Sequence, residues 1–271
     1  MRKIIIDSKN SFFQLDLREL LSYKDLFLTL AYRDIKVRYA HTFLGVTWTV
    51  LQPLANLLIF ILVFGMAMKI DTGGTPYALH ALCGLCGWTY FSTVISQSGS
   101  AIIGQQNLIQ KIYFPRIILP FSKAIAALLD LAISLALLLI ALVYYHFTPP
   151  SQVVFLPLFI LFTFMITISV NLWLSALTVR FRDFQYIIPF LVQFGLYATP
   201  IAYPVRLIPA KFQFIYAMNP MSGLIEGYRW CVLGDTLNWQ HQLVSAAMTV
   251  LLFIGGFIYF KRVEHNIADI I

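Results

Sequence analysis

Cys83 and Cys86 lie two residues apart and follow His80, a grouping that could bind a metal ion or cycle between thiol and disulfide. A zinc site needs a fourth ligand of suitable geometry, and a thioredoxin-like pair needs a strand–helix–strand setting. The surrounding sequence shows neither. Cysteines in so apolar a setting behave as small hydrophobic residues. We therefore interpret them as packing residues of a membrane helix and predict no metal site.

Motifs for catalysis and nucleotide binding are absent from the sequence. It contains no Gly-x-x-x-x-Gly-Lys-[Ser/Thr] loop for phosphates, no His-Glu-x-x-His and no Gly-x-Ser-x-Gly. We predict no catalytic residue and no cofactor bound by this chain. Any work driven by ATP must then come from another subunit.

Asp130 is an ionisable residue inside an apolar run, two helical turns after Lys123. A charge at such a position is costly and should face protein, a partner charge or water. A structural role, in which Asp130 pairs with Lys123 or with a neighbouring helix, is favoured over a proton relay, because no second membrane carboxylate lies near it in the sequence.

The composition is that of a membrane protein rather than of a soluble domain. The 271 residues are 59% hydrophobic and 11% charged, with a mean hydropathy of +0.78, whereas soluble domains are about 25% charged. The net charge of +7 would suggest nucleic acid in a soluble protein, but here its distribution matters more, and we expect no nucleic-acid partner. Residues 1–42 lack the features of a cleaved signal peptide.

Apolar stretches of sufficient length predict an all-α protein with six membrane spans. Fifteen of the 19 Lys and Arg residues fall on one side of these spans, which predicts that both termini are cytoplasmic. The expected spans are Phe43–Met68, Tyr77–Ala101, Ala124–Phe147, Val153–Val179, Tyr186–Tyr203 and Leu243–Phe260.

Two segments outside the spans are candidates for contact with a partner or with lipid headgroups. Tyr23, Leu26, Phe27 and Leu30 recur at helical spacing and predict an amphipathic helix in the membrane interface. Its basic residues 33–38 either anchor the helix to lipid or form a docking surface. Residues 104–120 form a second polar and basic segment between two uncharged runs.

Ser92, Ser96, Ser100 and Gly104 repeat every four residues and therefore share one face of the second predicted span. Such a stripe either permits close helix packing or forms a smooth wall for a polar substrate.

Residues 204–242 form an unusually long outer segment. Within it, residues 221–233 predict a short helix that ends at Gly234, on which Glu226 and Arg229 can pair. Its aromatic residues indicate either an interfacial belt or helices that dip into the outer leaflet.

Several motifs together resemble the permease subunit of ABC-2-type exporters, and most closely the polysaccharide and O-antigen branch, with teichoic-acid and capsule exporters nearby. The motifs follow one another along nearly the whole chain. They are Tyr32–Tyr39, Leu44–Trp48, Gln52-Pro53, Asn107–Arg116, Val179–Asp183, Thr199-Pro200 and Asn219–Trp230.

The resemblance implies a homodimer in the inner membrane of a bacterium, served by two cytoplasmic ATPase subunits that hold ATP and Mg²⁺. The cargo would be a lipid-linked glycan. The domains would be residues 1–42 as a cytoplasmic arm, 43–260 as the six-span unit and 261–271 as a tail. The expected ATPase contacts are Arg33, Lys36, Arg38, Asn107, Lys111, Tyr113 and Arg116.

Alternative functions left open are an ABC-2 permease for a small molecule or drug, a membrane-embedded glycan or lipid transferase, and a channel or proton-coupled carrier.

A translocation path and an outer gate are expected as well. Aromatic rings can stack on sugars, and the serine stripe could form a smooth wall for a polar substrate. The path candidates are therefore Trp88, Tyr90, Phe91, Ser92, Ser96, Ser100 and Tyr197. The gate candidates are Pro220, Glu226, Tyr228, Arg229 and Trp230.

Overall fold

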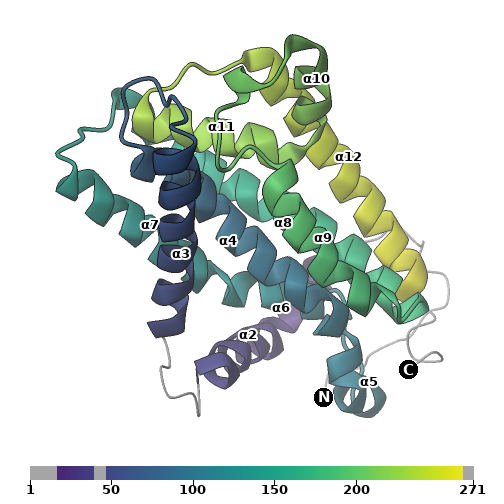
Figure 1. Ribbon diagram of the computed structural model, residues 1–271. Coiled ribbons are helices and arrows are strands. Elements are labelled where there is room, and N and C mark those ends of the chain that lie inside the picture. Colours follow the sequence, from purple (N-terminus) through teal and green to yellow (C-terminus); the bar gives the residue numbers. More distant parts are fainter. Residues whose placement is uncertain (1–16, 40–46, 265–271) are drawn as a thin grey trace.

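The computed structural model describes residues 17–39 and 47–264, and within these ranges every regular element is a helix (Figure 1). The predicted arm and tail fall partly outside the described residues. The elements are α1 (Leu17–Ser22), α2 (Lys24–Tyr39), α3 (Thr47–Phe60), η1 (Ile61–Ala67), α4 (Tyr77–Ala101), η2 (Ile103–Gln105), α5 (Gln106–Lys111), α6 (Ile118–Ala126), α7 (Leu128–Tyr144), η3 (Ser151–Phe155), α8 (Leu156–Arg180), α9 (Phe184–Ala198), η4 (Val205–Leu207), α10 (Ala210–Met218), α11 (Pro220–Leu233) and α12 (Trp239–Glu264).

Five helical stretches in the described chain are long and apolar enough to cross a membrane. They are Thr47–Ala67, Tyr77–Ala101, Ile118–Tyr144, Ser151–Arg180 and Trp239–Glu264. Each coincides with a predicted span to within a few residues, and α4 matches its prediction at both ends. The remaining predicted span, Tyr186–Tyr203, corresponds to α9, a shorter apolar helix of 15 residues.

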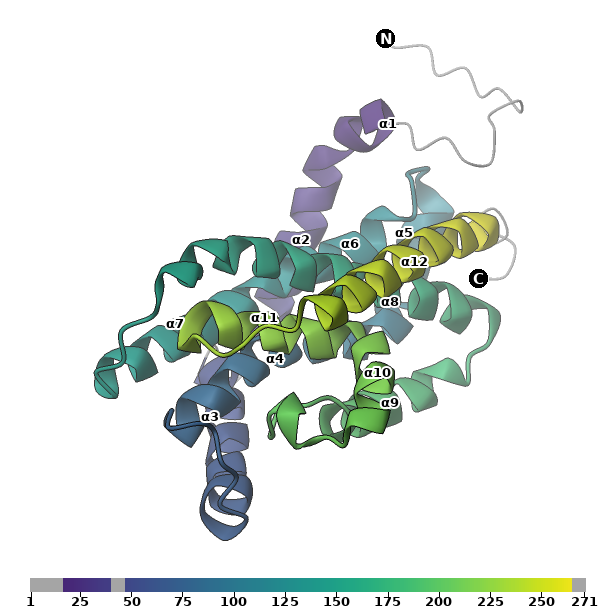
Figure 2. The same ribbon diagram turned by 90° about the horizontal axis from the view of Figure 1, so that it is seen from above.

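The long helices form a bundle with two distinct ends. Helices α2 and α5 lie at one end, called the α2 end, and α10 and α11 lie at the other, called the α11 end (Figure 1). Helices α4 and α8 run through the middle, and α12 packs along α8. Helices α3 and α9 flank α4 on the same side of the bundle, as both views show (Figures 1 and 2).

Helix α2 packs on the rest of the protein through the apolar residues that the sequence predicts at the membrane interface. Leu30 is buried, and Tyr23, Leu26 and Phe27 pack around the cluster that it joins. The helix lies against α6, and its polar side makes ion pairs with α6 and α7. Apolar contact and charge therefore act together to hold α2.

Helix α11 has a capping residue at each end, and the one at its C-terminal end is the predicted Gly234. The Asn219 side chain accepts a hydrogen bond from the Met221 backbone N–H, and Pro220 occupies the first helical position. Gly234 ends the helix with φ of 76°, a left-handed conformation that glycine adopts at little cost. The predicted short helix is confirmed.

Candidate functional site

The C-terminal half of α4 lines a groove of about 410 Å³, here called the α4 groove. Helix α4 forms its base, α3 contributes Trp48 and Gln52, and α9 contributes Val192. Arg38 and Asp130 lie at one edge. The residues of α4 in the lining are Thr89, Ser92, Thr93, Ser96 and Gln97.

These α4 residues recur at spacings of three and four, so they form a continuous polar stripe on one helix face. The Ser92 hydroxyl donates to the Thr89 carbonyl at 3.0 Å, which satisfies its hydrogen on its own helix. A polar face of this length is costly against hydrocarbon. It therefore needs water, substrate or another protein surface beside it.

Two of the seven predicted path residues, Ser92 and Ser96, line this groove. Tyr90 is fully buried, and its hydroxyl donates to the Ala124 carbonyl at 3.0 Å, so it acts as a packing residue. Trp88 is also buried, with its ring 5.4 Å from that of Phe91 between centroids. Ser100 and Tyr197 are exposed outside the groove lining.

Ion pairs connect the edge of the groove to α2. Arg38 binds Asp130, whose side chain is only 5% exposed, and Lys123 Nζ lies 3.0 Å from Asp34 Oδ2. Of the two partners predicted for Asp130, the structure has the neighbouring helix, while Lys123 pairs with α2 instead. A buried carboxylate with a bound guanidinium fits the structural role.

The segment predicted to couple to a partner exposes several of its expected contacts. Asn107, Lys111 and Tyr113 are exposed at the α2 end, and Lys36 of α2 is exposed too. This arrangement leaves amide, ammonium and phenol groups on the same end of the bundle.

The remaining expected contact residues are tied into the chain itself. The Arg33 guanidinium donates to Gln105 Oε1 at 3.0 Å, which links α2 to η2. The Arg116 backbone N–H donates to the Glu264 carboxylate at 2.7 Å, and Glu264 also binds Lys261 at 2.7 Å. The segment 104–120 is therefore attached to both α2 and the end of α12.

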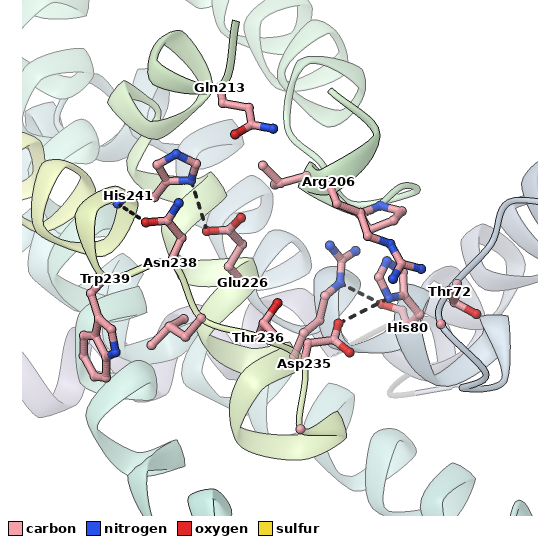
Figure 3. A pocket seen from close by; sticks show the side chains of 16 residues that line it. Thr72, His80, Arg206, Gln213, Glu226, Asp235, Thr236, Asn238, Trp239 and His241 are labelled. Carbon is pink, nitrogen blue, oxygen red and sulfur yellow. Dashed lines mark hydrogen bonds and ion pairs between the residues drawn. The ribbon is translucent and has the colours of Figure 1, made fainter. Parts of the chain in front are cut away.

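At the α11 end lies a larger cavity of about 710 Å³, here called the α11 cavity. It opens between the α3–α4 loop, the residues before α10, and the loop from α11 to α12. Figure 3 shows Glu226 and His241 pointing toward one another, and Asp235 pointing toward His80. The separations are 4.0 Å and 3.9 Å, respectively.

The gate candidates divide between this cavity and the core. Arg229 lines the cavity but is 98% buried, and it donates to the backbone carbonyls of Ile201, Tyr203 and His80. The expected Glu226–Arg229 ion pair is replaced by these bonds and by the contact of Glu226 with His241.

The aromatic gate candidates contribute packing. Tyr228 is fully buried and its hydroxyl lies 3.0 Å from that of Thr163. Trp230 packs between Phe155 and Trp239, with centroid distances of 5.5 and 6.0 Å.

Burial perturbs the charged groups of the α11 cavity. It raises the pKa of Glu226 to about 7, although the Arg229 charge acts in the opposite direction. Burial also lowers the pKa of Arg229 to about 10 and raises the pKa of Asp235. Desolvation disfavours the charged form of each group, so Glu226 changes its charge near neutral pH.

Cys83, Cys86 and Cys231 are buried free thiols. Among the described residues no three metal-binding side chains lie together. Cys86 instead donates its thiol to the Ser134 carbonyl at 3.3 Å.

Sequence reasoning missed much of both cavities. On α4, Thr89, Thr93 and Gln97 extend the predicted serine stripe, and counting spacings of three as well as four would have found them. His241 and Asp235 gave no such signal, because their partners lie far away in the sequence.

Comparisons with known proteins agree on one family. The model of the ABC-2 type transporter family matches residues 25–233. The chain is 31% identical over 257 residues to the O-antigen export system permease protein RfbA of Myxococcus xanthus, covering 91% of this chain and 96% of that protein. It is 27% identical to a protein of the same name from Klebsiella pneumoniae, covering 91% and 95%. It is 28% identical to the polysialic acid transport protein KpsM of Escherichia coli, covering 86% and 91%. The chain belongs to the ABC-2 type transporter family, as a membrane permease subunit and not an enzyme.

Proposed function

We propose that this chain is the transmembrane subunit of an ATP-driven exporter that moves a lipid-linked polysaccharide from the cytoplasmic to the outer face of a bacterial inner membrane. The observation that carries the proposal is the α4 groove, a polar surface on the side of an apolar bundle. The relatives named for O-antigen export and polysialic acid transport support a glycan as the cargo.

A second copy of the chain would close the groove. In one chain the two cavities are separated along α4 by the buried residues 81–88, so a continuous path does not run inside a single copy. Helices α3 and α9 flank the groove and expose many large apolar side chains. A homodimer that covers this side would shield the polar stripe from lipid and enclose a path between two α4 helices.

In this arrangement α9 crosses the membrane as the fifth of six spans, with the turn after it extending its reach. The α2 end faces the cytoplasm, because the basic residues concentrate there. Helices α10 and α11 then lie in the outer leaflet. Helix α2 rests at the cytoplasmic interface on α6.

The driving force would come from two ATPase subunits bound at the α2 end, which hold the ATP and Mg²⁺. Their contacts are Lys36, Asn107, Lys111 and Tyr113. Movement there would pass to the groove through Arg33 and Arg38, because these residues join α2 to η2 and to Asp130.

A blocking substitution tests the role of the groove. In cells that lack the chromosomal copy, we expect Ser96→Trp to abolish surface polysaccharide while lipid-linked glycan accumulates inside, because the indole fills the lining. Ala136→Trp, at an exposed position of α7, should export normally. Extraction of inner-membrane glycolipid and staining of surface glycan measure the two pools.

The result can contradict the proposal in two ways. Unchanged surface polysaccharide in the deletion strain would exclude the proposed cargo. Normal export by Ser96→Trp, at wild-type protein levels, would remove the groove from the path. Lys111→Glu should reduce co-purification of the ATPase, whereas Lys211→Glu at the opposite end should not.

A further inference from the structure

The α11 cavity contains groups that the proposed export path does not use. His80 lines the cavity, and its side chain is 1% exposed. Among the described residues neither ring nitrogen of His80 has a hydrogen-bond partner, and the same holds for Glu226 Oε2. Buried polar groups normally have partners. The missing hydrogen-bond partners of His80 and Glu226 point to hydrogen-bonding groups supplied by a molecule in the cavity.

The two acid–imidazole pairs have a spacing that suits an inserted hydroxyl group. Glu226 Oε2 lies 4.0 Å from His241 Nδ1, and Asp235 Oδ2 lies 3.9 Å from His80 Nδ1. Both distances exceed a direct hydrogen bond. His80 Nδ1 and Glu226 Oε2 have almost no accessible surface, so a small rotation of these side chains would be needed to admit a hydroxyl oxygen about 2.8 Å from both atoms of a pair. It would donate to the carboxylate and accept from the imidazole N–H.

The two guanidinium groups and the two carboxyl groups in the cavity lining offset one another, which favours a neutral ligand over an anionic one. Arg229 is engaged by three backbone carbonyls. Arg206 binds the Asp71 carbonyl at 2.8 Å and lies 3.5 Å from the Asp71 carboxylate. The two carboxylates of Glu226 and Asp235 remain in the lining, so a neutral ligand rich in hydroxyl groups fits better.

Trp239 adds an apolar surface at the cavity. It lines the site and is 65% exposed, with one ring neighbour in Trp230 at 6.0 Å. Aromatic faces bind the C–H faces of sugar rings while the polar rim remains hydrated. The volume of about 710 Å³ lies within the range of about 300–1,000 Å³ typical of small-molecule sites.

We propose that the α11 cavity is a binding site for neutral sugar units, in which the two acid–imidazole pairs bind hydroxyl groups and Trp239 stacks on a ring. This inference rests on the proposed export function, because it places the site where an exported glycan would emerge. Binding there would hold the leading part of the chain on the outer side between steps.

The test uses the full chain in lipid nanodiscs without ATP. The probes are short oligosaccharides released by mild acid from the surface polysaccharide of the host cell, with inorganic phosphate as the anionic comparison. We expect saturable oligosaccharide binding by calorimetry and no phosphate binding. Trp239→Ala should weaken oligosaccharide binding at least tenfold, and Glu226→Gln several-fold.

Phe214→Ala is the matched control, since Phe214 is an exposed aromatic residue of α10 outside the cavity lining. It should bind like the wild type. Equal binding by Trp239→Ala and the wild type, or no binding by the wild type, overturns the site. Trp239 and Phe214 are mostly exposed, so Trp239→Ala, Phe214→Ala and the wild type should have equal thermal midpoints, which would show that folding is intact.

The deletion strain separates this inference from the proposed function. Loss of surface polysaccharide together with no oligosaccharide binding overturns the cavity site and leaves the export function standing. Normal surface polysaccharide together with Trp239-dependent binding supports the site and overturns the export function.

Discussion

At the scale of single residues, glycines and buried polar groups set the close packing of the α11 end. A Cβ atom at Gly227 would collide with the Phe159 ring, and one at Gly223 would collide with the Ser245 side chain. Helices α8, α11 and α12 can approach because these positions have no side chain. The same end also holds Glu226, a carboxyl group that titrates near neutral pH.

Gly227→Ala is expected to destabilise the protein by about 1–3 kcal/mol, the usual cost of overpacking a core, since the added methyl group must displace the Phe159 ring. The thermal midpoint of detergent-solubilised protein measures it. Gly104→Ala is the control, because nothing lies within 4 Å of its Cβ position. An unchanged midpoint for Gly227→Ala would contradict the close contact.

The contribution of Glu226 to the stability of the folded state should fall as pH rises from about 4.5 to 7. Because the pKa of Glu226 is raised to about 7, the folded state binds more protons in this window than the unfolded state does. Glu226→Gln should remove this dependence. Its thermal midpoint should equal that of the wild type near pH 4.5 and exceed it above pH 7, by a free energy of at most about 3 kcal/mol.

Two charged or titratable groups act on Glu226, Arg229 on the same helix and His241 on α12. The variant His241→Gln is therefore measured together with Glu226→Gln. A pH dependence that persists in Glu226→Gln and disappears in His241→Gln would assign the effect to the imidazole.

At the scale of elements, α2 is held by one apolar face and two ion pairs on α6 and α7. Its position matters because Arg38 and Asp130 also border the α4 groove. A helix that joins the predicted docking surface to the groove edge can transmit movement between them.

Reversing one ion pair tests this attachment. Asp34→Lys places two ammonium groups together and should displace α2, so we expect weaker export and faster proteolysis of the N-terminal arm. Lys123→Asp combined with Asp34→Lys restores opposite charges and should recover both. A double-mutant cycle over the wild type, the two single variants and the double variant gives the interaction energy between the two residues. Additive defects would show that the 3.0 Å contact contributes nothing.

At the scale of the whole molecule, α4 connects two polar cavities through a buried middle. The α4 groove opens between α3 and α9, and the α11 cavity lies at the opposite end. Such a molecule is incomplete alone in a bilayer, because a polar stripe and large apolar faces share one side. The proposed pairing of two copies would cover both.

Cysteine crosslinking tests the pairing. Leu58 on α3 and Phe194 on α9 are both exposed, and each lies about 15 Å from the α2 end of its helix at 1.5 Å per residue. The double variant Leu58→Cys/Phe194→Cys should yield covalent dimers in membranes with a bismaleimide. The native cysteines are buried, so they need no replacement. Leu139→Cys/Phe194→Cys, with one position on α7, should remain monomeric, and the reverse pattern would place the interface elsewhere.

The sequence by itself determined the helical class, the five long membrane helices and the short helix α11, because hydropathy and capping depend on residues close together in the chain. It also indicated the serine stripe of α4 and a helical partner for Asp130. Only the tertiary structure decided that this partner is Arg38, that Tyr90 is a packing residue, and that His80, Glu226, Asp235 and His241 share one cavity. These outcomes depend on contacts between segments up to about 150 residues apart, such as His80 and Asp235. Such contacts follow from how helix faces fit together, which local patterns do not encode.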